Sequence, residues 1–278
     1  MKTYKSIKVR RDTKRVFFKL GTCSRTFFYL LNREYESPRE MEEHAADPLA
    51  GGILQQGYQC GMLWGASLAL GAESYRKCEK PDRAIGLSII ATQHVMKSFV
   101  KRAKSADCLD ITNCDFTKKF SIVKLFFSGR FYSCFKLAEK WAPEAFESAV
   151  EGLSIDQAAI PQKPISCASV VAKKMGASEE EMVMVAGFAG GLGLSGGGCG
   201  ALSAAIWMKT LAEIKKGNDK ISFSNPITEK LLLSFYQETD YEMQCCKIIG
   251  KSFKTVDEHT EFIKNGGCEK LINILGQS

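Results

Sequence analysis

"AGGLGLSGGGCG", residues 189–200, holds seven glycines and one cysteine, and an earlier stretch, "AGGILQQGYQCG" at residues 50–61, is similar to it. A shift of 139 residues aligns the two, and residues 50–66 then match their counterparts at eight of seventeen positions. Composition alone would give about one such identity. Because 139 is half of the 278-residue length, the sequence predicts that the whole chain is two copies of one unit.

Eight of the eleven cysteines follow this repeat. The expected pairs are Cys23 with Cys167, Cys60 with Cys199, Cys108 with Cys246, and Cys134 with Cys268. Neighbouring residues agree for the last two pairs, since "CLDI" stands beside "CKII" and "CFKL" beside "CEKL". Cys78, Cys114 and Cys245 lack counterparts, although Cys114 competes with Cys108, and we expect all three to be packing residues.

Most of the repeated cysteines stand where a helix is expected to begin. "GGGCGALSAAIWMKTLAEIKK" is a glycine-rich turn followed by a helical pattern, and "PISCASVVAKKMG" offers Ser166 as a cap and Gly176 as a stop. Helical patterns dominate elsewhere, so the strand-like "FSIVKLFF" at 120–127 is expected to be a buried helix segment or an isolated extended piece.

The predicted fold is therefore all-α, with two homologous helical repeats packed about a pseudo-twofold axis. The expected boundaries are a basic N-terminal arm at 1–15, a first four-cysteine repeat at 16–153, a linker at 154–165 and a second four-cysteine repeat at 166–278.

A helix N-terminus presents unpaired N–H groups and a partial positive charge. This position favours a thiolate and can lower a cysteine pKa from about 8.5 to between about 3.5 and 7.5. Glycines before Cys60, Cys199 and Cys268 lack the Cβ atoms that would keep backbone N–H groups away from sulfur. The sequence therefore predicts a cradle for an anionic metal–sulfur centre.

Charge and cysteine usage exclude several other classes. Residues 1–20 carry eight basic side chains and one acid, which accounts for the whole net charge of +7 and leaves no basic face for nucleic acid. The basic arm could meet an acidic partner or a membrane surface, or it could simply be solvated. The eleven cysteines are an odd number and no apolar signal segment begins the chain, so we expect a reducing cytoplasm.

Three alternative interpretations of the sequence have less support than a metal–sulfur centre. "GLGLSG" at 191–196 fits a dinucleotide motif, but the first copy lacks its middle glycine. Residues 182–208 are uncharged and long enough to span a bilayer, yet their glycines favour a buried turn and helix. Neither C-x-x-C nor C-x-x-C-H occurs, which argues against zinc and covalent haem, and His44, His94 and His259 do not recur between the halves.

Two chemical hypotheses remain beside a purely structural or interaction role. In the first, one iron–sulfur cluster is held in each half, since such clusters usually take four thiolates. The ligands would be Cys23, Cys60, Cys108 and Cys134 in one half and Cys167, Cys199, Cys246 and Cys268 in the other, the second set having the fuller glycine cradle. In the second, the same cysteines act as dithiol and disulfide pairs without metal.

"CGALSA" at 199–204 and "CGMLWG" at 60–65 resemble the C-G-A-x-x-G signature of the C_GCAxxG_C_C family of redox-active four-cysteine proteins. Met62 and Ala204 depart from that signature, while "LGTCSRTFF" and "PISCASVV" match its first cysteine phrase. Members usually have about half this length, so the chain resembles a tandem duplicate. A related module accompanies an iron–sulfur centre in split-Soret cytochromes, so the resemblance implies a cluster.

The expected activity is electron transfer with an unidentified redox partner protein, by a monomer with internal pseudo-symmetry or by a homodimer. Whether the chain is itself an oxidoreductase stays open.

Overall fold

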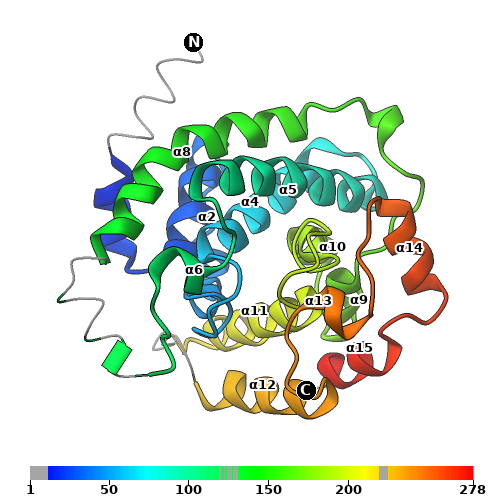
Figure 1. The fold of residues 1–278 in the computed structure, drawn as a ribbon. Coiled ribbons are helices and arrows are strands. Elements are labelled where there is room, and N and C mark those ends of the chain that lie inside the picture. Colours follow the sequence, from blue (N-terminus) through cyan, green and yellow to red (C-terminus); the bar gives the residue numbers. More distant parts are fainter. Residues whose placement is uncertain are drawn as a thin grey trace.

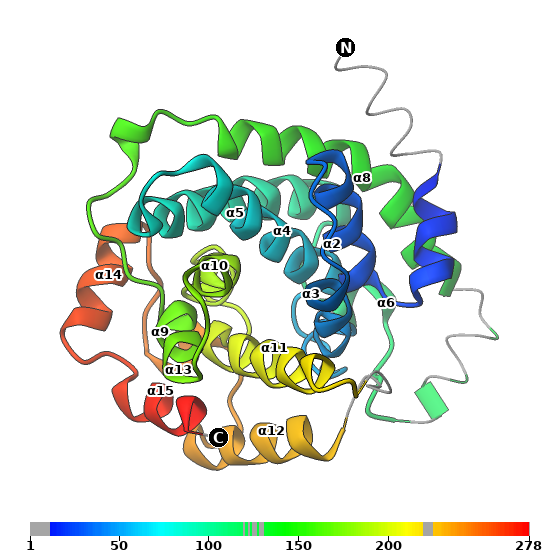
Figure 2. The same ribbon diagram turned by 180° about the vertical axis from the view of Figure 1, so that it is seen from behind.

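The computed structural model describes residues 12–118, 120–121, 123, 127, 131–218 and 225–277, which form helices and turns without a strand. Residues 1–11 of the predicted basic arm lie outside the described residues. Figure 1 shows the first-half helices in blue to green and the second-half helices in yellow-green to red, and Figure 2 shows the same arrangement from behind.

A helix over residues 12–20 leads into the first half. The other first-half helices are α2 (Cys23–Glu34), α3 (Glu40–Ala45), the 3₁₀ turn η1 (Asp47–Leu49), α4 (Gly61–Lys77), α5 (Pro81–Ala103), α6 (Cys108–Thr112) and α8 (Phe131–Leu153). The second half contains η2 (Gln157–Ala159), α9 (Cys167–Lys174), α10 (Glu179–Met184), η3 (Ala186–Phe188), α11 (Gly200–Lys215), α12 (Pro226–Glu238), α13 (Cys245–Ile248), α14 (Val256–Lys264) and α15 (Glu269–Gly276).

The 139-residue offset holds in three dimensions. It carries α3 onto α10 and η1 onto η3 residue for residue, and it carries the first residue of α4 onto the first residue of α11. Insertions elsewhere change the offset, which is 144 between the starts of α2 and α9 and 137 between the starts of α6 and α13. The all-α fold and its duplication are therefore confirmed.

The two halves pack reciprocally. Helix α4 lies against α10 and η3 of the second half, and α11 lies against α3 and η1 of the first. Helix α10 occupies the centre of both views (Figures 1 and 2). The same contact viewed from either half is the mark of a pseudo-twofold axis. One hydrophobic core runs through both halves and contains the three buried tryptophans, Trp64, Trp141 and Trp207.

Each repeated glycine stretch is a left-handed turn. Residues 51–55 and 57, and their counterparts 190–194 and 196, all have φ between 48° and 85°. Backbone hydrogen bonds match as well, because Ile53 N donates to Leu49 O just as Leu192 N donates to Phe188 O. The side chains of Ile53 and Leu192 are fully buried in the hydrophobic core. They anchor each turn there, just before α4 or α11 begins.

The left-handed turn argues against both a dinucleotide-binding loop and a membrane-spanning helix in this stretch. "GLGLSG" makes the left-handed turn, and the first copy makes it without the middle glycine. Within the described residues, no helix combines the length and apolar character that a bilayer crossing requires.

Signature glycines permit close helix crossing. A Cβ at Gly65 would lie 1.9 Å from the carbonyl oxygen of Ser24, so α4 and α2 meet backbone to backbone. The counterpart of Gly65 is Ala204, which keeps a Cβ inside the core. In the second half the corresponding contact is between α11 and the shorter α9.

Two sequence expectations need revision. Phe120, Ser121, Val123 and Phe127, the described residues of "FSIVKLFF", are helical, but Phe120, Val123 and Phe127 are exposed and therefore do not form a buried segment. Residues 12–15 of the predicted arm belong to the helix over 12–20, where Lys14 pairs with Glu139 at 2.7 Å.

Gly65→Ala should destabilise the protein, because the new methyl group meets backbone that cannot rotate away. We expect a loss of about 3 kcal/mol or more in the free energy of unfolding, the upper end of what an added core methyl group costs, measured by urea denaturation. The reverse change at the equivalent position, Ala204→Gly, should cost only about 1 kcal/mol of helix propensity. Equal losses for the two variants would contradict the close crossing.

Candidate functional site

Helix N-termini hold most of the predicted cysteines. Cys23 and Cys167 are the first residues of α2 and α9, behind the capping side chains of Thr22 and Ser166. Cys60, Cys199 and Cys268 are the N-cap residues of α4, α11 and α15, and Cys108 is the first residue of α6. Cys134 lies one turn inside α8. The predicted position at helix starts is therefore confirmed for these seven residues, counting Cys134 within the first turn, and the eighth, Cys246, is the second residue of α13.

Cys23, Cys60, Cys108 and Cys134, the first cysteine group, come together from α2, α4, α6 and α8. A hydrogen bond from the Cys60 thiol lowers the pKa of Cys23, and the same bond raises the pKa of Cys60. Burial raises the pKa of Cys108 well above its ordinary value and that of Cys134 to about 12, and charge on Cys23 would raise both further. Such mutual influence requires these thiols to be neighbours.

A fifth thiol belongs to the same neighbourhood. Cys114 is almost completely buried, and its charge would add to the raised pKa of both Cys108 and Cys134, behind the larger effect of burial. Its sulfur accepts a hydrogen bond from Ser121 at 3.5 Å. The sequence predicted a packing role for Cys114, because Cys108, its competitor for the repeated position, has the better-matching distance from Cys60.

In the second half the counterpart of Cys108 is Cys245, whereas the sequence predicted Cys246. Cys108 N donates to Tyr58 O at 2.7 Å, and its equivalent is Cys245 N, which donates to Gly197 O at 2.6 Å. The bridges between residues 59 and 107 and between residues 198 and 244 fix the same alignment. The pairing of Cys108 with Cys246 was therefore wrong by one residue.

Cys246 instead takes the place of Leu109. A Cβ on Gly196 would lie 2.9 Å from Cys246 Cβ, just as one on Gly57 would lie 3.1 Å from Leu109 Cβ. Cys246 thus covers the outside of the left-handed turn. Adjacent cysteines in a short segment gave the sequence no means of choosing between them.

Cys167, Cys199, Cys245 and Cys268 form the second cysteine group. Burial raises the pKa of Cys245, and charge on Cys199, Cys167 or Cys268 would raise it further. Burial also raises the pKa of Cys199 and of Cys268 to about 12, with a smaller contribution from charge on Cys167. All four members of this group therefore influence one another.

Burial outweighs the helix-end effect that the sequence predicted. Among the eight predicted cysteines only Cys23 has a lowered pKa, whereas burial or a thiol hydrogen bond raises the pKa of six others. The expected N–H donors are nevertheless present. Gly51 N–H donates to Cys23 sulfur and Gly190 N–H donates to Cys167 sulfur, each from the first residue of a left-handed turn.

The glycines after Cys60 and Cys199 are required by space. A Cβ at Gly61 would lie 2.5 Å from Cys23 Sγ, and one at Gly200 would lie 1.8 Å from the carbonyl oxygen of Phe188. A side chain at Gly61 would therefore displace the thiol that its neighbour Cys60 contacts.

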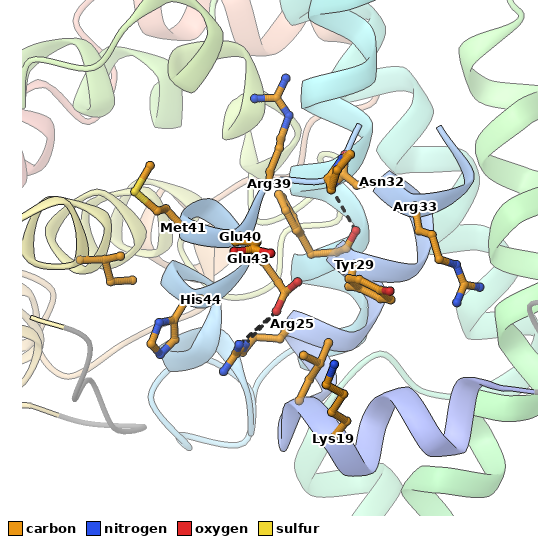
Figure 3. A pocket seen from close by; sticks show the side chains of 14 residues that line it. Lys19, Arg25, Tyr29, Asn32, Arg33, Arg39, Glu40, Met41, Glu43 and His44 are labelled. Carbon is orange, nitrogen blue, oxygen red and sulfur yellow. Dashed lines mark hydrogen bonds and ion pairs between the residues drawn. The ribbon is translucent and has the colours of Figure 1, made fainter. Parts of the chain in front are cut away.

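A buried polar network fixes the start of α2. Thr22 Oγ1, directly before Cys23, donates to Asp47 Oδ1 at 2.7 Å. Arg25 pairs with Asp47 at 3.4 Å and with Glu43 at 3.1 Å. Figure 3 shows the Arg25–Glu43 contact in the wall of a cavity of about 500 Å³ beside α2 and α3. In the second half Ser166 donates instead to the backbone oxygen of Ala186, at 3.0 Å.

The three histidines make local contacts. His44 faces Asp47 at 3.7 Å and His94 faces Glu151 at 4.0 Å. His259 is buried, which lowers its pKa to about 4, and its Nδ1 contacts Ile165 O at 3.0 Å, two residues before Cys167. In the described part of the chain, no three His, Cys, Asp or Glu side chains are already spaced as metal ligands.

The fold and these two groups define a duplicated all-α protein with clustered, buried thiols. The family model "Putative redox-active protein (C_GCAxxG_C_C)" matches the chain twice, over residues 22–143 and 165–276. The chain therefore belongs to the C_GCAxxG_C_C family and contains two copies of its unit. No curated protein and no solved structure matches the chain in the corresponding comparisons.

Cys60→Ala should raise the pKa of Cys23 by removing the thiol that donates to its sulfur. Alkylation of Cys23, followed by mass spectrometry of the tryptic peptide 20–25, should therefore reach half its maximal rate at higher pH. Cys60→Ser retains a donor and should give a smaller shift. If the two variants match the natural protein, the hydrogen bond does not control Cys23.

Proposed function

We propose that each half binds an iron–sulfur cluster through its cysteine group and that the chain transfers electrons to a redox partner protein. The observation that carries the proposal is the gathering of four thiols from four separate helix starts, twice in one chain. Membership of a redox-active family supports the same class of chemistry.

The donor set fits such a cluster. Four cysteine thiolates are its usual ligands, and each group supplies four thiols. The cradle also fits, because Gly51 and Gly190 direct N–H groups at sulfur and Gly61 leaves Cys23 Sγ the space that a Cβ would take. Hydrogen bonds to ligand sulfurs and burial are the features by which a protein adjusts a cluster's potential.

The cluster would supply one-electron chemistry, and the chain's residues would provide and protect its ligands. Since burial holds most of these thiols protonated, binding requires them to release protons. Cys23, the thiol with the lowered pKa, is ready to be the first ligand. The surrounding core keeps water away from the sulfurs, with Cys60, Cys108, Cys167 and Cys199 all less than a tenth exposed.

A metal-free dithiol reaction is the second candidate, favoured by the Cys60-to-Cys23 hydrogen bond. The Cys23 thiolate would attack a disulfide of a partner protein, forming a mixed disulfide and releasing one partner thiolate. Cys60, after losing its proton, would attack Cys23 Sγ and release the second thiolate. The chain is thereby oxidised by two electrons and the partner is reduced. Either reaction needs reduced thiols, so we propose a reducing compartment such as the cytoplasm.

Iron and acid-labile sulfide analysis of protein purified without oxygen tests the first candidate. We expect stoichiometric iron, visible charge-transfer absorption, and a loss of about half the iron in either Cys60→Ala or Cys199→Ala if both halves are filled. Colourless, metal-free protein whose thiols disappear in pairs on oxidation would favour the second candidate. If Cys60→Ala and Cys199→Ala change neither iron nor oxidised thiol content, both candidates fail.

The register predicts a difference between two adjacent cysteines. Cys245→Ser should lower the iron bound by the second half, because Cys245 occupies the position of Cys108, whereas Cys246→Ser should leave it unchanged. Iron and sulfide content measured in a Cys60→Ala background isolates the second half. If Cys246→Ser loses iron and Cys245→Ser keeps all of it, the pairing of Cys108 with Cys246 expected from the sequence is correct after all.

A further inference from the structure

Gln59, the residue before Cys60, reaches across the boundary between the halves. Its side chain is almost fully buried. Its Oε1 accepts from Gly198 N at 2.7 Å, and its Nε2 donates to Gly191 O at 3.1 Å and to Ser195 Oγ at 3.4 Å. Gly198 is the residue before Cys199. One side chain therefore connects the backbone beside one N-cap cysteine to the backbone beside its counterpart.

The contact exists only because the two copies differ at this point. Shifting Tyr58 and Gln59 by 139 residues gives Gly197 and Gly198. A Cβ at Gly197 would lie 1.5 Å from Gln59 Nε2, and one at Gly198 would lie 2.6 Å from Ile53 Cδ1. Gly197 and Gly198 therefore make room for first-half side chains. The sequence had suggested another reason, namely that these glycines let backbone N–H groups come close to sulfur. Two identical copies could not form this contact.

Both ends of the connection are anchored. Gln59 O accepts from Trp64 Nε1 at 3.0 Å, and the Trp64 ring lies edge-on to Phe188 of the second half, with centroids 4.8 Å apart. Gln59 is also paired with Asp107 in one bridge, and Gly198 is paired with Gln244 in the other. Cys108 and Cys245 follow directly in those bridges, so four thiol-bearing segments share this anchor.

We propose that Gln59 is a positioning residue that couples the two cysteine groups, so that a change at Cys60 alters the environment of Cys199. A buried amide with both its donor and its acceptor satisfied has one favoured placement. Movement of the α4 start therefore moves the Gly198 backbone, and the coupling acts equally in the reverse direction. The inference rests on the proposed function in treating both groups as working sites.

Alkylation of Cys199 in the folded, reduced, metal-free chain tests the coupling without any bound cluster, so its failure is distinct from failure of the proposed function. Tryptic peptide 175–209 contains Cys199 as its single cysteine. Gln59→Met keeps the volume and removes the hydrogen bonds, and it should change the labelling rate about fivefold or more, the lower end of couplings between sites. Gln56→Ala is the matched control, because Gln56 meets Tyr236 of the second half at 3.1 Å but adjoins no cysteine.

A double-mutant cycle completes the test. Cys60→Ala should change Cys199 labelling in the natural chain and leave it unchanged when Gln59→Met is also present. Natural-rate labelling in Gln59→Met would mean that Gln59 only fills space, and an equal effect of Cys60→Ala in both backgrounds would mean that coupling bypasses Gln59. Either result overturns the proposal, and Gln56→Ala matching Gln59→Met would do so too.

Discussion

Both halves depend on a constraint in the backbone: the chain enters α4 and α11 through a turn that lies in the left-handed region. A residue with a Cβ costs about 1–2 kcal/mol in that conformation, and Ile53, Leu54 and Leu192 adopt it. Complete burial of an aliphatic side chain gains about 1.5–3 kcal/mol, so the core offsets the strain. The same turn directs the N–H groups of Gly51 and Gly190 at cysteine sulfur. The backbone strain, the burial of the aliphatic side chains and the placement of the thiols therefore all follow from this one turn.

The duplication could be predicted from sequence because residues 40–77 and their counterparts contain no insertion, so one offset explains every identity. The all-α class followed from caps and helical patterns that act within a few residues. The pairing of Cys246 could not be predicted reliably, because Cys245 and Cys246 differ by one position and the segments before them differ in length. The hydrogen bond from Cys245 N to Gly197 O and the bridge between Gly198 and Gln244 fix that register.

Effects that depend on packing between distant parts of the chain could not be predicted from local sequence patterns either. Helix starts were identified correctly, but their influence on thiol pKa is smaller than that of burial, and burial is set by the whole core. Gly197 and Gly198 looked like part of a local sulfur cradle. Their Cβ positions are filled instead by Gln59 and Ile53, more than a hundred residues earlier in the chain.

Raised pKa values also constrain what the cysteine groups can do. Neutral thiols are compatible with a hydrophobic core, whereas four thiolates together in a medium of low dielectric would repel one another strongly. Deprotonation therefore has to be accompanied by a bound cation or by removal of electrons to form a disulfide. Only the first group already holds a thiol with a lowered pKa, Cys23. The contact through Gln59 lies between that half and the N-cap cysteine of the second.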